Sequence, residues 1–286
     1  MKTQTKKVFS LLNPKAPLFE EIRIQQPKWW NLLREDKELY IEIRKDNSIN
    51  VYFLGGSIAR INYKNGFEAK IHQKYLGNDK SRGKTKKGTD KFEYNIIDLK
   101  KLDVILLGEI KNNIKSNYIK HCNDENQSEK VSEKCIQGNM IKENLNYIDS
   151  EFQFNKDDVI KNLRIDLIEL KNGVLSFVEL KGIFDNRLRN DKLKNPNTPE
   201  IIQQMEKYRL FINKYELDII DYYKKLIEIK QSLELTTIKN ANFTLNKTPK
   251  LIIANTYKKI DPRREKRISD IKKLLKTYNI DYDIIK

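Results

Sequence analysis

Residues 163–181 read LRIDLIELKNGVLSFVELK, and this stretch decides the fold of the second half of the chain. Two apolar runs flank Asn172-Gly173. An Asn-Gly pair between such runs is the strongest short signal for a β-hairpin, because both turn residues need a positive φ. With these two residues as the loop, Lys171 pairs with Val174 and the rest of the register follows. The sequence therefore predicts two antiparallel strands in a fixed register.

This register brings four charged side chains to one face of the hairpin. Asp166 lies across from Glu179, and Arg164 lies across from Lys181. Both faces are otherwise mostly apolar, as in a sheet that is covered on both sides. Opposed carboxylates are costly there unless a cation lies between them. The two basic residues supply part of that charge, and Mg²⁺, which prefers hard oxygen ligands, would supply the rest. A salt-bridge cluster without metal is the alternative.

Further elements are predicted on both sides of the hairpin. They are a helix at 129–144, a strand at 147–154, a helix at 199–235, a buried strand at 248–254, a helix at 262–278 and a short strand at 282–285. Helices that alternate with strands in this way are typical of a layered α/β core with a mixed sheet. We expect residues 129–286 to form this core.

The first part of the chain has a different pattern. Short alternating runs at 39–44, 49–54, 57–63 and 67–75, separated by turn signals, predict a small β meander. The apolar spacing between 92 and 122 is that of a helix. We therefore expect a β-rich substrate-binding module over residues 1–95 and a helical linker over 96–128.

The charge of the chain points to an anionic partner. The 286 residues include 56 Lys and Arg against 40 Asp and Glu, a formal net charge of +16. Nucleic acid is the commonest partner of such a chain, and acidic lipid and the ribosome are rivals. Residues 64–91 hold nine of these cations against three acids, which favours either a phosphate-tracking loop or a solvated one. A second basic cluster, placed to steer a phosphate backbone, comprises Arg187, Arg189, Lys192 and Lys194.

Other classes of protein are disfavoured. No apolar run approaches the roughly 18 residues of a membrane span. Two cysteines are too few for a disulfide framework, so the reducing cytoplasm is the expected compartment. A homodimer is left open.

The charged residues of the hairpin resemble a known family. Asp166, followed on the next strand by Glu179-Leu180-Lys181, resembles the PD-(D/E)xK nuclease superfamily, whose members have the restriction-endonuclease-like fold. The resemblance covers roughly residues 129–286, and Ile165 stands where the family usually has proline. In this family a helix carrying an acid precedes the first strand, and Glu133 is the candidate, with Glu129 as the alternative.

A second motif lies on the helix that follows the hairpin. Gln204 and Tyr208 resemble the QxxxY motif of the RecB-like branch, and at i and i+4 they share one helix face. A chance polar face is the alternative.

The resemblance implies a set of roles. Asp166, Glu179 and the carbonyl of Leu180 would hold Mg²⁺, for which Mn²⁺ could substitute, and Lys181 would position the attacking water. Glu133 would orient a water, while Gln204 and Tyr208 would contact the substrate strand or that water.

These roles describe a metal-dependent nuclease. We expect a DNA endonuclease in restriction or anti-phage defence. A repair or RNA-directed nuclease on the same core is one alternative, and a non-catalytic nucleic-acid-binding protein is another.

Overall fold

The computed structural model describes residues 9–76, 82–84, 90–92, 94–118, 131–155, 160, 162–189, 198–239 and 241–286. The chain divides into two compact units, each of which is described by itself. Unit 1 comprises residues 1–123, 138–145 and 221–241, and unit 2 comprises residues 124–137, 146–220 and 242–286. Most of the basic stretch 78–90 lies outside the described residues, as do Glu129, Lys192 and Lys194.

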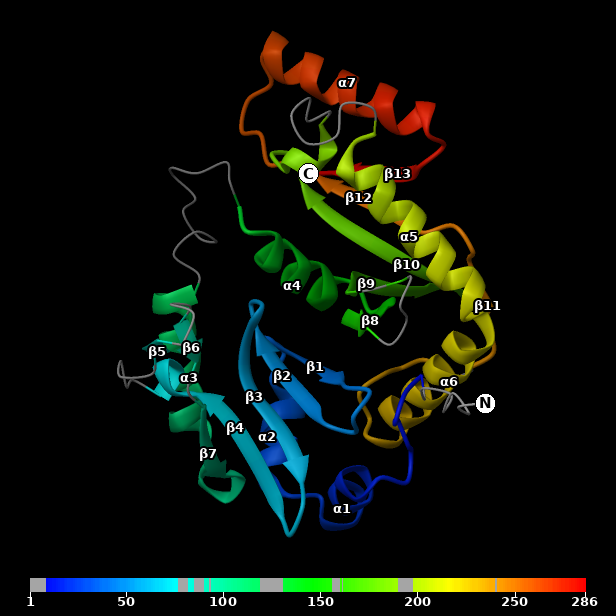
Figure 1. Ribbon diagram of the computed structural model, residues 1–286. Helices are drawn as coiled ribbons and strands as arrows, with labels where there is room; N and C mark the ends of the chain where they lie inside the picture. The colour runs from blue at the N-terminus through cyan, green and yellow to red at the C-terminus, as the bar shows by residue number, and fades with distance from the viewer. Residues whose placement is uncertain are drawn as a thin grey trace. The chain divides into compact units, whose positions relative to one another are not determined.

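Unit 2 is built on a mixed sheet (Figure 1). Its strands are β8 (Tyr147–Phe154), β9 (Leu163–Lys171), β10 (Val174–Gly182), β11 (Thr244–Leu245), β12 (Lys250–Ala254) and β13 (Asp281–Ile285). The order is β13-β12-β10-β9-β8, and β11 pairs with β10. Strand β9 is antiparallel to both its neighbours, whereas β12 and β13 continue parallel to β10. The predicted α/β class with a mixed sheet is confirmed.

The hairpin forms at the predicted turn. Asn172 and Gly173 have φ of 52° and 74°, and the strands pair from Lys171–Val174 to Leu167–Val178 in the predicted register. Seven consecutive residues of β10 are buried, as expected for a strand covered on both faces. Beyond Leu167 the two strands are joined differently, because the N–H of Leu180 donates to Oδ2 of Asp166 at 3.0 Å.

Helices α4 (Glu133–Glu143), α5 (Glu200–Lys214) and α7 (Pro262–Thr277) correspond to predicted helices. The helix expected over 199–235 is two helices, because α5 ends at Lys214 and α6 (Glu216–Ser232) begins after Tyr215. At this break the ring of Tyr215 packs 4.8 Å from that of Phe154. Phe211 of α5 packs against Phe152 and Phe177 of the sheet, with ring centroids 5.7 and 6.1 Å away. These contacts fix α5 on the strands that carry the charged residues.

Unit 1 contains the predicted meander. Its antiparallel sheet has the order β1 (Leu39–Ile43), β2 (Ile49–Phe53), β3 (Gly56–Tyr63), β4 (Phe67–His72) and β7 (Tyr94–Asp98). The unit also contains α1 (Pro17–Gln25), α2 (Lys28–Glu35), the 3₁₀ turns η1 (Gln73–Leu76) and η3 (Leu99–Lys101), the small strand pair β5 (Arg82–Lys84) and β6 (Asp90–Phe92), and α3 (Val104–Tyr118).

The helical prediction from residue 92 was wrong over Tyr94–Asp98, which forms β7. This segment pairs along its whole length with β4, so edge pairing outweighs the local spacing of apolar residues. Helix α3 starts only at Val104. Among the described residues, no helix combines the length and the apolar content that crossing a membrane requires.

The boundaries of the units differ from the predicted divisions at 95 and 128. Helix α3 belongs to unit 1, where Ile114 packs so closely on β3 that a Cβ added to Gly56 would lie 2.7 Å from its Cγ2. The second part of α6 also joins unit 1, and its Lys230 forms a buried ion pair with Glu42. Long-range packing of this kind is not visible in the local composition on which the predicted boundaries rest.

Candidate active site

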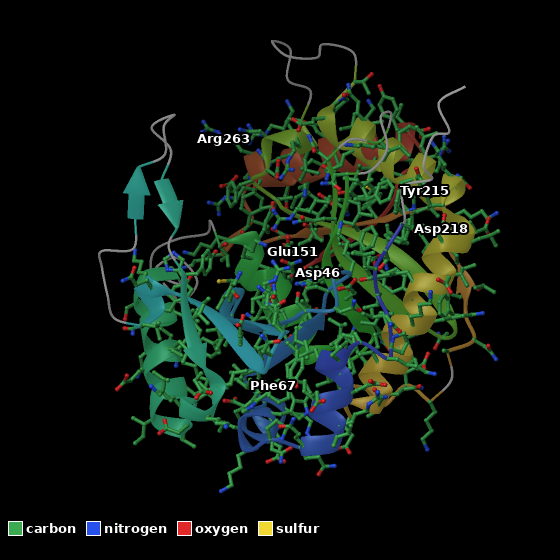
Figure 2. All side chains as sticks on the ribbon, turned by 60° about the horizontal axis from the view of Figure 1, so that its bottom comes forward. Asp46, Phe67, Glu151, Tyr215, Asp218 and Arg263 are labelled. Atoms are coloured by element: carbon green, nitrogen blue, oxygen red, sulfur yellow. The ribbon has the colours of Figure 1, made fainter. Side chains whose placement is uncertain are left out.

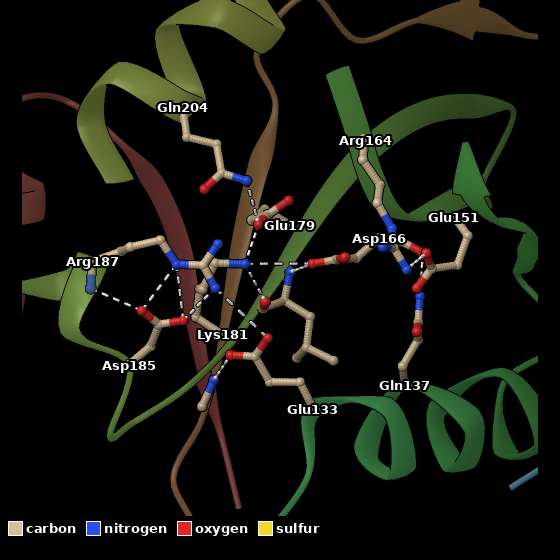
Figure 3. Close-up of polar contacts among 12 residues, drawn as sticks. Glu133, Gln137, Glu151, Arg164, Asp166, Glu179, Lys181, Asp185, Arg187 and Gln204 are labelled. Atoms are coloured by element: carbon tan, nitrogen blue, oxygen red, sulfur yellow. Dashed lines mark hydrogen bonds and ion pairs between the residues drawn. The ribbon is translucent and has the colours of Figure 1, made fainter. Parts of the chain in front are cut away.

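The carboxylate of Glu179 lies at the centre of a polar cluster in unit 2 (Figure 3). The residue sits on β10 and is 1% exposed. Its Oε1 accepts hydrogen bonds from Lys181 and, at 2.5 Å, from Nε2 of Gln204. Its Oε2 accepts one from the hydroxyl of Tyr208 at 2.6 Å. The predicted QxxxY pair therefore holds the predicted acid of the hairpin in place.

The ammonium of Lys181 is surrounded by three oxygen groups. Besides Glu179, it donates to the carbonyl of Leu180 at 2.8 Å and lies 3.6 Å from Oδ2 of Asp166. These are the three groups that the sequence predicts as metal ligands. They converge on the single charged nitrogen of Lys181, a residue that is only 2% exposed.

Burial changes the acidity of this cluster. Desolvation, followed by the negative charge of Asp166, raises the pKa of Glu179 from 4.5 to about 7, although Lys181 and Tyr208 act in the opposite direction. Desolvation and the neighbouring Glu179 also raise the pKa of Tyr208. The phenol therefore remains protonated and acts as a hydrogen-bond donor.

Helix α4 contacts the backbone of both hairpin strands through one face. Glu133 accepts a hydrogen bond from the N–H of Gly182 at 3.0 Å, and Gln137 donates to the carbonyl of Asp166 at 2.6 Å. Residues at i and i+4 share a helix face, so the two contacts require the same orientation of the helix. Burial raises the pKa of Glu133, against the effect of the Gly182 N–H.

The segment after β10 contributes an arginine. Arg187 donates from its backbone N–H at 2.8 Å and from its guanidinium to Asp185, and its Nη2 lies 3.9 Å from Oε2 of Glu133. Burial opposes ionisation of Asp185, but the hydrogen bonds from Arg187 hold its pKa below the ordinary value. The same pairing raises the pKa of Arg187. This guanidinium is thus held at the site as a permanent positive charge.

Two more basic side chains, Lys134 and Arg164, lie on the side of Asp166 away from Lys181. Glu151 of β8 forms ion pairs with both Lys134 and Arg164, as Figure 3 shows for Arg164. Glu151 has φ of 56°, a left-handed conformation that is rare for a residue other than glycine and that concentrates at functional sites.

The predicted pairing of Arg164 with Lys181 was wrong. In the structure Arg164 pairs with Gln153 of β8, and its half-exposed side chain turns to Glu151. The β9–β10 ladder ends before the position where these two residues would oppose each other.

One pocket of about 260 Å³ joins these groups. Of the predicted site residues, it brings together Glu133, Asp166, Glu179, Leu180, Lys181 and Gln204. Tyr208 does not line the pocket, but its hydroxyl donates to Glu179. The pocket also has four charged or polar residues that the sequence reasoning had not assigned to the active centre: Lys134, Gln137, Glu151 and Arg187. Gln137 could have been predicted, because it follows the candidate Glu133 by four residues and so shares its helix face.

The oxygen groups of this pocket suit a hard divalent cation. Within the described ranges, no set of three or more His, Cys, Asp or Glu side chains forms a metal site by itself. The candidate ligands are the carboxylates of Asp166 and Glu179 and the carbonyl of Leu180. Mg²⁺ commonly binds through one or two carboxylates and keeps several waters, and a cation between Asp166 and Glu179 would offset the negative charge of Asp166 that helps to raise the pKa of Glu179.

Comparisons with protein-family models, with curated proteins and with solved structures gave no match for this chain. The chemistry of the site therefore rests on its own residues.

Proposed function

We propose that this chain is a metal-dependent nuclease, with DNA as its expected substrate, built on a core of the restriction-endonuclease type. The observation that carries the proposal is the convergence of Asp166, Glu179 and the Leu180 carbonyl on the ammonium of Lys181. Two carboxylates and a carbonyl that face one point offer the hard oxygen ligands through which Mg²⁺ commonly binds, and such a metal activates water for phosphodiester hydrolysis.

The elements around the hairpin support the same proposal. Helix α4 precedes the three antiparallel strands and carries Glu133, and α5 follows them and carries Gln204 and Tyr208. The net charge of +16 suits a polyanionic substrate. Restriction or anti-phage defence is an expectation from the family resemblance, and fold alone does not determine such a role.

Each residue has a defined part in hydrolysis. A divalent cation held by Asp166, Glu179 and Leu180 would polarise the phosphate and acidify the attacking water. The Lys181 ammonium has no lone pair, so it positions this water and does not remove its proton. The water oxygen would bond to phosphorus while the bond to the leaving nucleotide oxygen breaks, and that oxygen would take a proton from a solvent water.

The remaining residues orient these groups and the substrate. Gln204 and Tyr208 hold both oxygens of Glu179. Glu133, whose Oε1 accepts the N–H of Gly182 and whose Oε2 lies 3.9 Å from Nη2 of Arg187, would orient this water and accept its proton. Arg187 supplies positive charge beside the transferred phosphate.

Digestion of linear, circular and single-stranded DNA with Mg²⁺, and again with EDTA, tests the proposal. We expect cleavage only with the metal, and we expect Asp166→Ala, Glu179→Ala and Lys181→Ala each to lower the rate by several orders of magnitude. Glu169→Ala is the matched control, because Glu169 lies on β9 outside the pocket.

Three outcomes distinguish the alternatives. Metal-dependent cleavage of RNA in preference to DNA would favour the RNA-directed nuclease. Binding of DNA without hydrolysis of any substrate would favour the non-catalytic binding protein. Cleavage by Glu179→Ala at the wild-type rate would refute the site.

A further inference from the structure

Unit 2 contains a second and larger pocket, of about 730 Å³. It lies between the segment after β10 and helix α7, and we call it the basic-aromatic pocket. Phe184 and Tyr257 line it, with their rings edge to face and 4.9 Å apart. Its volume falls in the range of about 300–1,000 Å³ that small-molecule sites occupy. The space is therefore sufficient for one planar ligand group with its substituents.

The lining of this pocket is strongly basic. It includes five cations, Arg189, Arg263, Arg264, Lys266 and Arg267, against two acids, Asp261 and Asp270. Asp261 caps α7, because its carboxylate accepts the N–H groups of Arg263 and Arg264 at 2.9 and 3.0 Å. The side chains of Arg263 and Lys266 are exposed, and Figure 2 shows Arg263 at the periphery. The excess of positive charge favours an anionic ligand.

Flat groups organise the inside of the pocket. The guanidinium of Arg264 lies 4.9 Å from the centre of the Tyr257 ring, and that of Arg267 lies 6.0 Å from the centre of the Phe184 ring. Arg267 is fixed by a hydrogen bond from Nε to the carbonyl of Ile183 at 3.0 Å. Unpaired nucleobases stack on aromatic rings and on arginine planes, so these surfaces match a base as well as the phosphate that accompanies it.

One chain segment connects this pocket to the candidate active site. Phe184 follows Lys181 by three residues, a distance of at most about 11 Å along the chain. In the short 3₁₀ turn η4 (Asn186–Leu188), Arg187 lines the active-site pocket, and directly after the turn Arg189 lines the basic-aromatic one. A strand of nucleic acid that reaches both pockets would place its two contacted nucleotides close together.

We propose that the basic-aromatic pocket binds one unstacked nucleotide of a single-stranded segment, with its base stacked on the Tyr257 ring, the Phe184 ring standing edge to face beside it, and its phosphate on Arg263 and Lys266. The identity of the ligand as part of the substrate rests on the proposed nuclease function. A duplex keeps its bases stacked inside the helix, so this pocket selects single strands, frayed ends or gaps. An acidic peptide or an anionic lipid would use the charge but would not need the rings.

Fluorescence anisotropy with a labelled oligonucleotide tests the proposal. The full chain is titrated in EDTA against a single strand and against the duplex of the same sequence, so binding is measured without cleavage. We expect Tyr257→Leu to weaken single-strand binding about tenfold, the size of one lost base stack, and to leave duplex binding nearly unchanged. A single strand carrying an abasic residue at the contacted position should lose the same factor with the wild type and nothing further with Tyr257→Leu.

A variant that removes only exposed charges tests the proposal without changing the packing of the Phe184 and Tyr257 rings. Arg263→Ala combined with Lys266→Ala removes exposed side chains, and we expect the plot of log affinity against log salt to flatten by about 0.7 per lost contact on a single strand. Lys272→Ala combined with Lys273→Ala is the matched control, because both lysines are exposed on α7 outside the pocket. Its salt slope should stay closer to that of the wild type.

Several results would overturn the inference. Equal losses for single strand and duplex with Tyr257→Leu would show that the pocket does not hold a base, and equal slopes for the two double variants would show that Arg263 and Lys266 do not hold its phosphate. Tighter binding of an acidic peptide or of phosphatidylserine vesicles than of the single strand would overturn the inference as well. Pocket-dependent binding by a chain that hydrolyses nothing would remove the nuclease proposal and leave this one standing.

Discussion

The pair of carboxylates at the candidate active site makes a prediction about stability without metal. The pKa of Glu179 is raised from 4.5 to about 7, and about 1.4 kcal/mol accompanies each pKa unit. Ionising Glu179 in the fold therefore costs about 3 kcal/mol above that pKa. Burial is the largest cause and the charge of Asp166 is the next, so we assign about 1 kcal/mol of this cost to Asp166.

Asp166→Asn should consequently stabilise the metal-free protein. The amide oxygen still accepts the N–H of Leu180, and Lys181 keeps Glu179 and the Leu180 carbonyl as partners. For a chain of this size, about 1 kcal/mol corresponds to a rise in Tm of about 2 °C. Scanning calorimetry in EDTA at about pH 8 measures it.

The dependence on pH provides the control. The folded state binds the proton of Glu179 more tightly than the unfolded state does, so the penalty grows as pH rises from about 4.5 to about 7 and is complete above that. At about pH 5 Glu179 is protonated in the fold, so Asp166→Asn should raise Tm much less there. A variant that is less stable than the wild type at about pH 8 would show that Asp166 acts mainly as a salt-bridge partner of Lys181, which would refute this reasoning.

Three further predictions concern other parts of the structure. Mg²⁺ or Mn²⁺ should raise the Tm of the wild type, by the equivalent of about 2.7 kcal/mol at one hundred times Kd, and a calorimetric scan of Glu179→Ala should show little of this rise. Gly56→Ala should lower the free energy of unfolding by about 1–3 kcal/mol, because the new methyl would lie 2.7 Å from Ile114. Gly108→Ala should raise it by up to about 1 kcal/mol, because the new methyl has open space in α3. Urea unfolding that gave both changes the same sign would contradict this. Glu151→Gly should relieve the strain of the left-handed backbone yet weaken DNA binding measured by anisotropy, because Lys134 and Arg164 lose the carboxylate that holds them both. Unchanged affinity would show that this carboxylate does not position the two cations for binding.

The hairpin shows how far local sequence determined the prediction of the site. Asn172-Gly173 fixes the turn and the alternation predicts that Asp166, Glu179 and Lys181 share a face. The acids do meet at Lys181, although the ladder ends at Leu167–Val178, before Asp166 and Glu179 would pair. The position of Arg164 did not follow, because the strands stop pairing at Leu167 once the Asp166 side chain takes the N–H of Leu180. A side chain that replaces a ladder hydrogen bond cannot be foreseen from alternation.

The parts that sequence missed depend on contacts between distant segments. Strand β7 had helical spacing but found an open edge on β4. Glu151 became part of the site through a left-handed backbone, and in the sequence it was one of several polar residues on its strand. The basic-aromatic pocket joins residues about 75 positions apart, such as Phe184 and Tyr257, so no local motif announces it.

The buried ammonium of Lys181 has a consequence for how the chain folds when no metal ion is bound. Many small metal sites are unformed until the ion arrives, since their ligands repel one another, and such proteins unfold when it is chelated. Here a covalently attached counter-ion already offsets one of the two negative charges. Under the proposed function, a newly synthesised molecule would therefore complete its fold without divalent cations, and its assembled centre would become active when they bind.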